Sequence, residues 1–119
     1  MPILSIAVVT LFLVHEMDAI KAGEYRMFPL IKKLPEEKAY LVFTALHIPL
    51  FFLILSLMLS PYSLYLYIFL DVFAIIHVGL HLLLRNHPQN CFGSWFSQAL
   101  IYTTGGLGAL DLFMRVVGS

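Results

Sequence analysis

Charge is scarce in this chain of 119 residues, and it is distributed unevenly. Only 12% of the residues are charged, whereas a soluble domain has roughly 25%. Ten of the fourteen charged residues lie between positions 16 and 38, and the segment 39–84 contains a single charge, Asp71. With 61% apolar residues and a mean hydropathy of +0.90, the composition excludes a soluble enzyme, a nucleic-acid-binding protein and a disordered tail.

Net charge and cysteine pairs are also missing. Seven basic and seven acidic residues balance, so no basic surface for nucleic acid is expected. The single Cys91 cannot form an intramolecular disulfide. No Lys or Arg precedes the apolar stretch 3–14, and the polar residues 15–18 stand where a signal-peptide cleavage site needs small residues. We therefore expect this stretch to be a retained membrane span.

Four apolar segments are long enough to cross a membrane, since a hydrocarbon core of about 30 Å needs roughly 20 helical residues. The predicted spans are about 3–20, 40–60, 63–84 and 95–117. Their apolar runs are continuous, which favours helices over barrel strands. The predicted fold class is all-α, an integral membrane four-helix bundle that occupies residues 1–119 as one transmembrane domain, with an interfacial loop between helices 1 and 2.

Basic residues concentrate in two of the predicted loops. The first loop holds Lys21, Arg26, Lys32, Lys33 and Lys38, and the third holds Arg85. Only Arg115, at the other end of the fourth span, opposes this pattern. Because cytoplasmic loops carry an excess of Lys and Arg, we expect a multi-pass protein of the cell inner membrane with both termini outside the cytoplasm.

Histidines fall at one depth in three of the spans. Counted at about 1.5 Å per residue from the nearest cytoplasmic charge, four of them lie roughly 6 to 13 Å inside the membrane. Ionisable groups within a span are costly and are functional candidates by default. The matched depth predicts that five residues converge on one cavity in the cytoplasmic half of the bundle: His15, Glu16, His47, His77 and His81.

The spacing and residue types favour a metal ion as the ligand of this cavity. His77 and His81 are four residues apart and share one helix face, a standard way to present two nitrogens to a metal. Imidazoles together with carboxylates suit zinc, iron or manganese, and a divalent metal, zinc or iron, is the expected cofactor. The five residues of the cavity are the predicted ligands. Glu16 is also the candidate catalytic residue, as a general base.

Three further polar residues are predicted to support the ligands. Asp18 can share a helix face with His15, because the two are three residues apart. Glu24 and Arg26 follow in the first loop, and we hypothesise that one of them folds back and orients a ligand by hydrogen bonding. An exposed contact between Glu24 and Arg26 at the headgroups is the alternative.

Structural roles remain open for the same polar residues. A membrane histidine such as His47 often only forms a hydrogen bond within a bundle. Glu16 and Asp18 can cap the end of the first span and pair with Lys21. His87 lies in a polar loop and is expected to be solvated.

The remaining polar and small residues of the spans allow more limited expectations. Asp111 can pair with Arg115 at a spacing of four residues, and Asp71 lies near mid-span, where it either bonds a tyrosine such as Tyr67 or receives protons. Glycines in the third and fourth spans are expected to allow close helix approach or to leave a cavity: Gly79, Gly105, Gly106 and Gly108.

Four motifs follow one another along the chain: His15-Glu16-Met17-Asp18-Ala19, Glu24-Tyr25-Arg26, His47-Ile48-Pro49-Leu50 and the pair His77-x-x-x-His81. This order resembles an uncharacterised family of small bacterial four-span membrane proteins with the motifs His-Glu-x-Asp-Ala, Glu-Trp-Arg, His-x-Pro-Leu and a paired histidine. Tyr25 stands where that family has tryptophan. The resemblance extends over almost the whole chain and implies a membrane location and a shared polar set, but no substrate.

Several functions are compatible with these features. The first is a metal-dependent membrane enzyme whose hydrolytic or oxidative reaction acts on a lipid-like small molecule entering from the bilayer. The second is a haem-binding electron carrier, with two histidines of facing helices as axial ligands. A transporter, an accessory subunit and a purely structural protein are further alternatives. The sequence indicates the lipid bilayer and no nucleic acid as partners, and leaves the oligomeric state and any enzymatic activity open.

Overall fold

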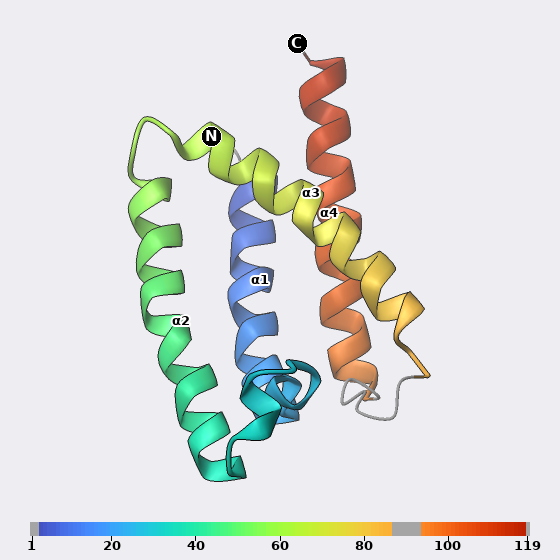
Figure 1. Ribbon diagram of the computed structural model, residues 1–119. Coiled ribbons are helices and arrows are strands. Elements are labelled where there is room, and N and C mark those ends of the chain that lie inside the picture. Colours follow the sequence, from blue (N-terminus) through green and yellow to red (C-terminus); the bar gives the residue numbers. More distant parts are fainter. Residues whose placement is uncertain (1–2, 87–93, 119) are drawn as a thin grey trace.

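The computed structural model describes residues 3–86 and 94–118, which form four long helices (Figure 1). The helices are α1 (Ile3–Ala22), α2 (Glu36–Met58), α3 (Ser63–Leu83) and α4 (Trp95–Val117), and two short 3₁₀-helices, η1 (Glu24–Met27) and η2 (Ile31–Lys33), follow α1. No strand is present in the described ranges, and each long helix is long and apolar enough to cross a membrane. The predicted all-α four-helix membrane bundle is confirmed. His87, which was expected to be solvated, lies outside the described residues.

The helix boundaries follow from local chemistry. Gly23 comes directly after α1 with a φ of 75°, a left-handed conformation that glycine adopts without a Cβ penalty. α2 begins at Glu36, immediately after Pro35, and carries two carboxylates in its first turn, where the positive end of the helix dipole favours them. At the start of α4, the Ser94 hydroxyl accepts a hydrogen bond from the backbone N–H of Ser97 at 3.1 Å.

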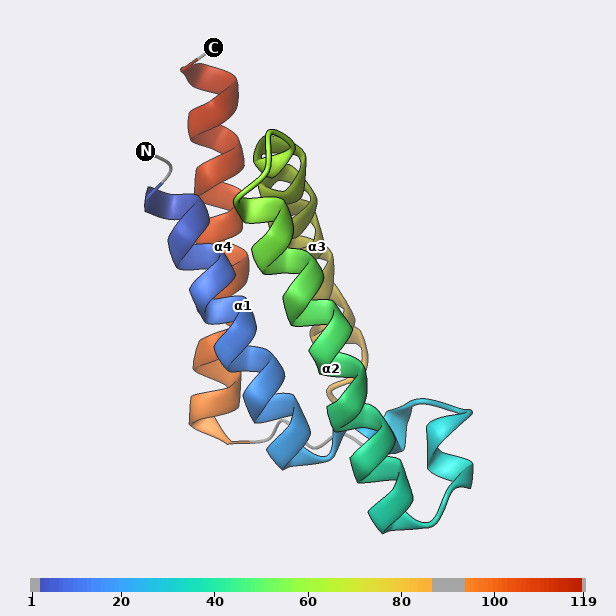
Figure 2. The ribbon, with the colours of Figure 1, turned by 90° about the vertical axis from the view of Figure 1, so that its left-hand side faces the viewer.

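Three of the helices pack closely, whereas α2 stands apart (Figures 1 and 2). The most extensive interfaces join α4 to α3 and to α1, and α2 contacts its neighbours sparsely. Of the residues in the most apolar part of α2, 17% are buried, compared with 33% for α1 and for α4. This loose attachment leaves room between α2 and the other helices, on the side where the candidate site lies.

The two ends of the bundle differ in charge. Both termini lie at one end, and η1 and η2 lie at the other, together with the end of α3 and the start of α4 (Figure 1). The basic residues of the segment 21–38 and Arg85 therefore share one end of the molecule. The main apolar core lies in the half nearer the termini and comprises Val8, Val9, Phe12, Ile54, Leu66, Tyr67 and Leu70.

Two glycines allow α3 and α4 to approach closely. A Cβ atom on Gly105 would overlap the Cγ2 methyl group of Val78, and one on Gly108 would lie 3.1 Å from a backbone oxygen of α3. The predicted role in helix approach is confirmed for these two residues. It is wrong for Gly79 and Gly106, where a Cβ atom would meet nothing within 4 Å, because both lie on exposed faces of their helices.

Candidate metal centre

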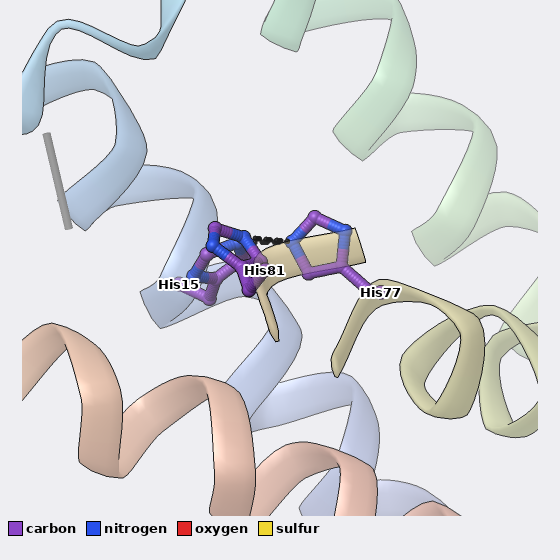
Figure 3. A group of neighbouring side chains, drawn as sticks. All are labelled: His15, His77 and His81. Atoms are coloured by element: carbon purple, nitrogen blue, oxygen red, sulfur yellow. Dashed lines mark hydrogen bonds between the residues drawn. The ribbon is translucent and has the colours of Figure 1, made fainter. Parts of the chain in front are cut away.

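Three histidines from two helices bring their ring nitrogens together (Figure 3). The Nε2 atom of His77 lies 2.8 Å from Nε2 of His15 and 3.0 Å from Nε2 of His81. One ligand atom from each residue lies within 4.8 Å of the other two. Two nitrogens on one tetrahedral zinc are roughly 3.3 Å apart, given bonds of about 2.05 Å. Small side-chain movements would therefore bring all three nitrogens to one ion. We call these residues the histidine triad.

The triad follows from helix geometry and from the packing of α1 against α3. His77 and His81 are one turn apart on α3, so both rings leave the same face of the helix, as their spacing predicts. His15 projects from α1 and is 2% exposed, while the two α3 histidines are half-buried. The three rings meet edge to face, with centroids between 4.5 and 5.8 Å apart. One side of the triad is thus sealed inside the bundle and the other side is accessible.

Hydrogen bonding alone does not account for both contacts at Nε2 of His77. A neutral imidazole nitrogen either donates its one hydrogen or accepts through its one lone pair. Nε2 of His77 contacts both His15 and His81. Its one hydrogen or one lone pair can form a good hydrogen bond with only one of them. A metal ion accepts a lone pair from each ring, so the donor set fits a metal. The haem alternative stays a prediction that these contacts do not favour, because axial nitrogens lie on opposite sides of the iron, whereas those of His15 and His77 nearly touch.

Glu16 and His47 form a separate pair at the side of the triad. Nδ1–H of His47 donates to the backbone oxygen of Phe43 at 2.7 Å, and its Nε2 lies 2.8 Å from Oε2 of Glu16. With Nδ1 protonated, the contact between Nε2 and Oε2 holds a second proton, either on the imidazole or on the carboxyl group. Both residues were predicted as metal ligands. Neither belongs to the group of mutually close ligand atoms.

A cavity of about 950 Å³ joins the pair to the triad. Glu16, His47, His77 and His81 line it, together with Glu24, and the buried His15 lies behind His77. The rest of the wall is mainly apolar and comes from α1, α2 and α3, including Phe12, Leu50, Ile54, Leu66, Phe69 and Phe73. The ionisable groups thus gather at the end of the cavity near η1, and an apolar channel extends from them towards the termini.

Of the predicted supporting residues, Glu24 lies nearest to the pair. It lines the cavity. Burial, and after it the charge of Glu16, raise the pKa of the Glu24 carboxyl to about 7, while His47 opposes the shift. Asp18 lies on the other side of α1, where its Oδ2 accepts a hydrogen bond from Ser97 Oγ at 2.6 Å. It joins α1 to α4 one turn away from His15.

Arg26 points away from the histidines. Its Nη2 donates to Oε1 of Glu36 at 2.6 Å, and the side chains of the two residues are 48% and 69% exposed. The Tyr25 hydroxyl donates to the same oxygen at 3.3 Å. These contacts tie η1 to the start of α2. The sequence did not indicate them, nor the partnership of Asp18 with Ser97, because neither pair has a spacing or motif that marks it.

The chain belongs to a family of unknown function, DUF6713, which matches residues 1–117. No curated protein and no solved structure matches it. The expected membership in an uncharacterised family is confirmed, and the family adds neither an activity nor a substrate. Any assignment of function therefore depends on the residues themselves.

Proposed function

We propose that this multi-pass membrane protein binds a zinc or iron ion through His15, His77 and His81. The observation that carries the proposal is the meeting of three ring nitrogens at His77, with contacts of 2.8 and 3.0 Å that hydrogen bonding cannot satisfy together. Three histidines with a further position open to water or substrate are a donor set of catalytic zinc sites. Such an ion would act as a Lewis acid and lower the pKa of a bound water.

Glu16 is the proposed general base beside this ion. His47 holds its carboxyl group through the 2.8 Å contact, and the backbone bond from His47 to Phe43 fixes the imidazole in turn. The two residues lie within hydrogen-bond distance of each other and line the same cavity as His77 and His81. It is therefore suited to accept a proton from a reacting group in the cavity and to return it.

The proposed substrate is a lipid-like molecule with one long apolar chain and a polar head. The walls of the cavity support this choice, since its ionisable groups lie at one end and its other residues are mainly apolar. The loose attachment of α2 offers an entrance from the bilayer. A chain lying in the cavity would place its head beside the triad and the Glu16–His47 pair.

Metal content tests the first part of the proposal. Protein purified in mild detergent and dialysed against zinc should hold one ion per chain. His77→Ala should lose it, because His77 contacts both other ligands. His47→Gln should keep it, because Nε2 of His47 faces Glu16. Wild-type protein without zinc, or a His77→Ala variant with unchanged zinc, would refute the triad as a metal site.

Lipid extraction tests the second part. Leu50 lines the cavity, and Leu50→Trp should fill part of it and reduce the amount of single-chain lipid that mass spectrometry detects in purified protein. Leu55, on the exposed side of α2 and 49% exposed, provides the matched control Leu55→Trp. Equal lipid content in the two variants would contradict the proposed site, whatever their metal content.

The proposed location is the inner membrane of a bacterial cell, with η1 and η2 in the cytoplasm and both termini outside. The shared end of the basic residues supports this orientation. In a Cys91→Ser background, Ser63→Cys should react with a membrane-impermeant maleimide on intact cells. Lys33→Cys should react only after permeabilisation, and its labelling in intact cells would reverse the orientation.

A further inference from the structure

A second polar cluster lies in the half of the bundle nearer the termini, where α1, α3 and α4 meet. It consists of Ser5, Asp71, Asp111 and Arg115. Oδ2 of Asp111 accepts hydrogen bonds from Ser5 Oγ at 2.6 Å and from Arg115 Nη2 at 3.1 Å, and the same arginine nitrogen also donates to Ser5 Oγ. Asp111 is 6% exposed and Ser5 is 1% exposed. Oδ2 of Asp111 thus accepts from a hydroxyl and from a guanidinium, both of which stabilise a carboxylate.

Asp71 has a different environment within the same cluster. It is completely buried, and neither of its carboxyl oxygens has a hydrogen-bond partner. Its Oδ2 lies 3.9 Å from Nε of Arg115, which is too far for a hydrogen bond. An ionised carboxylate buried without hydrogen bonds is strongly unfavourable.

The charges of the cluster do not balance when both aspartates are ionised. One guanidinium then faces two carboxylates. The other groups in contact are the neutral hydroxyl of Ser5 and the ring of Tyr67, whose centroid lies 5.9 Å from the Arg115 guanidinium carbon. Two carboxyl groups in one buried site hold a proton between them, because like charges at short range repel strongly in a low dielectric. A proton on Asp71 would also allow it to donate a hydrogen bond to Asp111.

We propose that Asp71 is a proton-binding residue, which holds one proton at neutral pH and shares it with the ionised Asp111. The bound proton makes the cluster electrically neutral, since Arg115 balances the remaining carboxylate. Loss of this proton would leave a net negative charge at the interface between α3 and α4. The two helices are close there, since a Cβ atom on Gly108 would lie 3.2 Å from Cα of Asp71. Proton release would therefore weaken the contact between α3 and α4.

Infrared spectroscopy tests the proposal directly. Wild-type protein in lipid vesicles at neutral pH should show the carbonyl band of a protonated carboxyl group, and ¹³C labelling of aspartate should shift that band, which separates it from the glutamates. Asp71→Asn should abolish it. The chain has one aspartate outside the cluster, Asp18, which accepts a hydrogen bond from Ser97, so Asp18→Asn should leave the band unchanged.

Three results would overturn the proposal: a wild-type spectrum without an aspartic-acid band, a band that persists in Asp71→Asn, or a band that disappears in Asp18→Asn. Should Asp71→Asn fail to fold, the labelled wild type still reports whether an aspartic acid is protonated. Asp18→Asn then assigns the proton to the cluster of Asp71 and Asp111 by elimination, since the band should remain in that variant.

Discussion

The two buried polar clusters place polar side chains inside an apolar bundle in different ways. The histidine triad lies beside a cavity of about 950 Å³ and the loosely attached α2, whereas the aspartate cluster is enclosed by α1, α3 and α4. Imidazoles are neutral and need no counter-charge to line an accessible cavity. Carboxylates in a low dielectric need a cation or a proton and must be closed off from lipid. This difference agrees with the proposal that one end of the bundle binds a ligand, whereas the other end holds the helices together.

The largest expected effect is that of removing the Asp111 carboxylate. Asp111→Ala leaves Arg115 and Ser5 without their buried partner, and it should lower the free energy of unfolding by about 3 kcal/mol. Denaturant unfolding in detergent micelles measures this change. His77→Ala in chelator-treated protein should cost roughly 1 kcal/mol, since no buried charge loses a partner. Equal losses would mean that the two ends do not differ as proposed.

A glycine substitution tests the closed end by its packing alone. Gly105→Ala forces a methyl group into Val78, whose branched side chain has little rotamer freedom in a helix. It should lower the free energy of unfolding by about 1–3 kcal/mol. The neighbouring Gly106→Ala meets open space and should stay within about 0.5 kcal/mol of the wild type. A reversed order of the two variants would show that α3 and α4 are not held at this contact.

The cavity end should respond to pH through Glu24. Its pKa is about 7 in the folded protein and about 4.3 in an unfolded chain, so between these values the folded state binds more protons than the unfolded state. Stability should therefore fall as the pH rises through this window and level off above it. Glu24→Gln should remove that part of the dependence. Thermal unfolding of metal-free protein at several pH values measures it, and identical profiles would exclude a buried Glu24.

The smallest effect is expected at the exposed surface of the cavity end. Arg26→Ala removes the pair with Glu36, whose members are about half exposed or more, and it should change the free energy of unfolding by less than about 1 kcal/mol. Zinc content should not change, since Arg26 faces away from the triad. A loss of zinc in this variant would instead support the hypothesis that Arg26 orients a metal ligand.

Local patterns were sufficient to predict the four helices and part of the candidate site. A span needs a continuous apolar run of about 20 residues, and such runs can be counted along the chain. The pairing of His77 with His81 and of Asp111 with Arg115 follows from the pitch of a single helix. The position of each histidine along its helix follows from the rise per residue. Each of these properties belongs to one helix at a time.

The number of helices long enough to span a membrane, the position of each polar residue along its helix and the pairs within a helix could therefore be predicted from the chain alone. Packing between helices places His15 in the triad and pairs the adjacent Glu16 with His47. It also brings Ser5 to Asp111, 106 positions away. The same packing leaves α2 apart from the other helices, with a cavity beside it. The physical reason is that hydropathy sets how deep a residue lies, whereas the rotation of each helix about its axis and its distance from its neighbours arise from side chains that pack together from different helices.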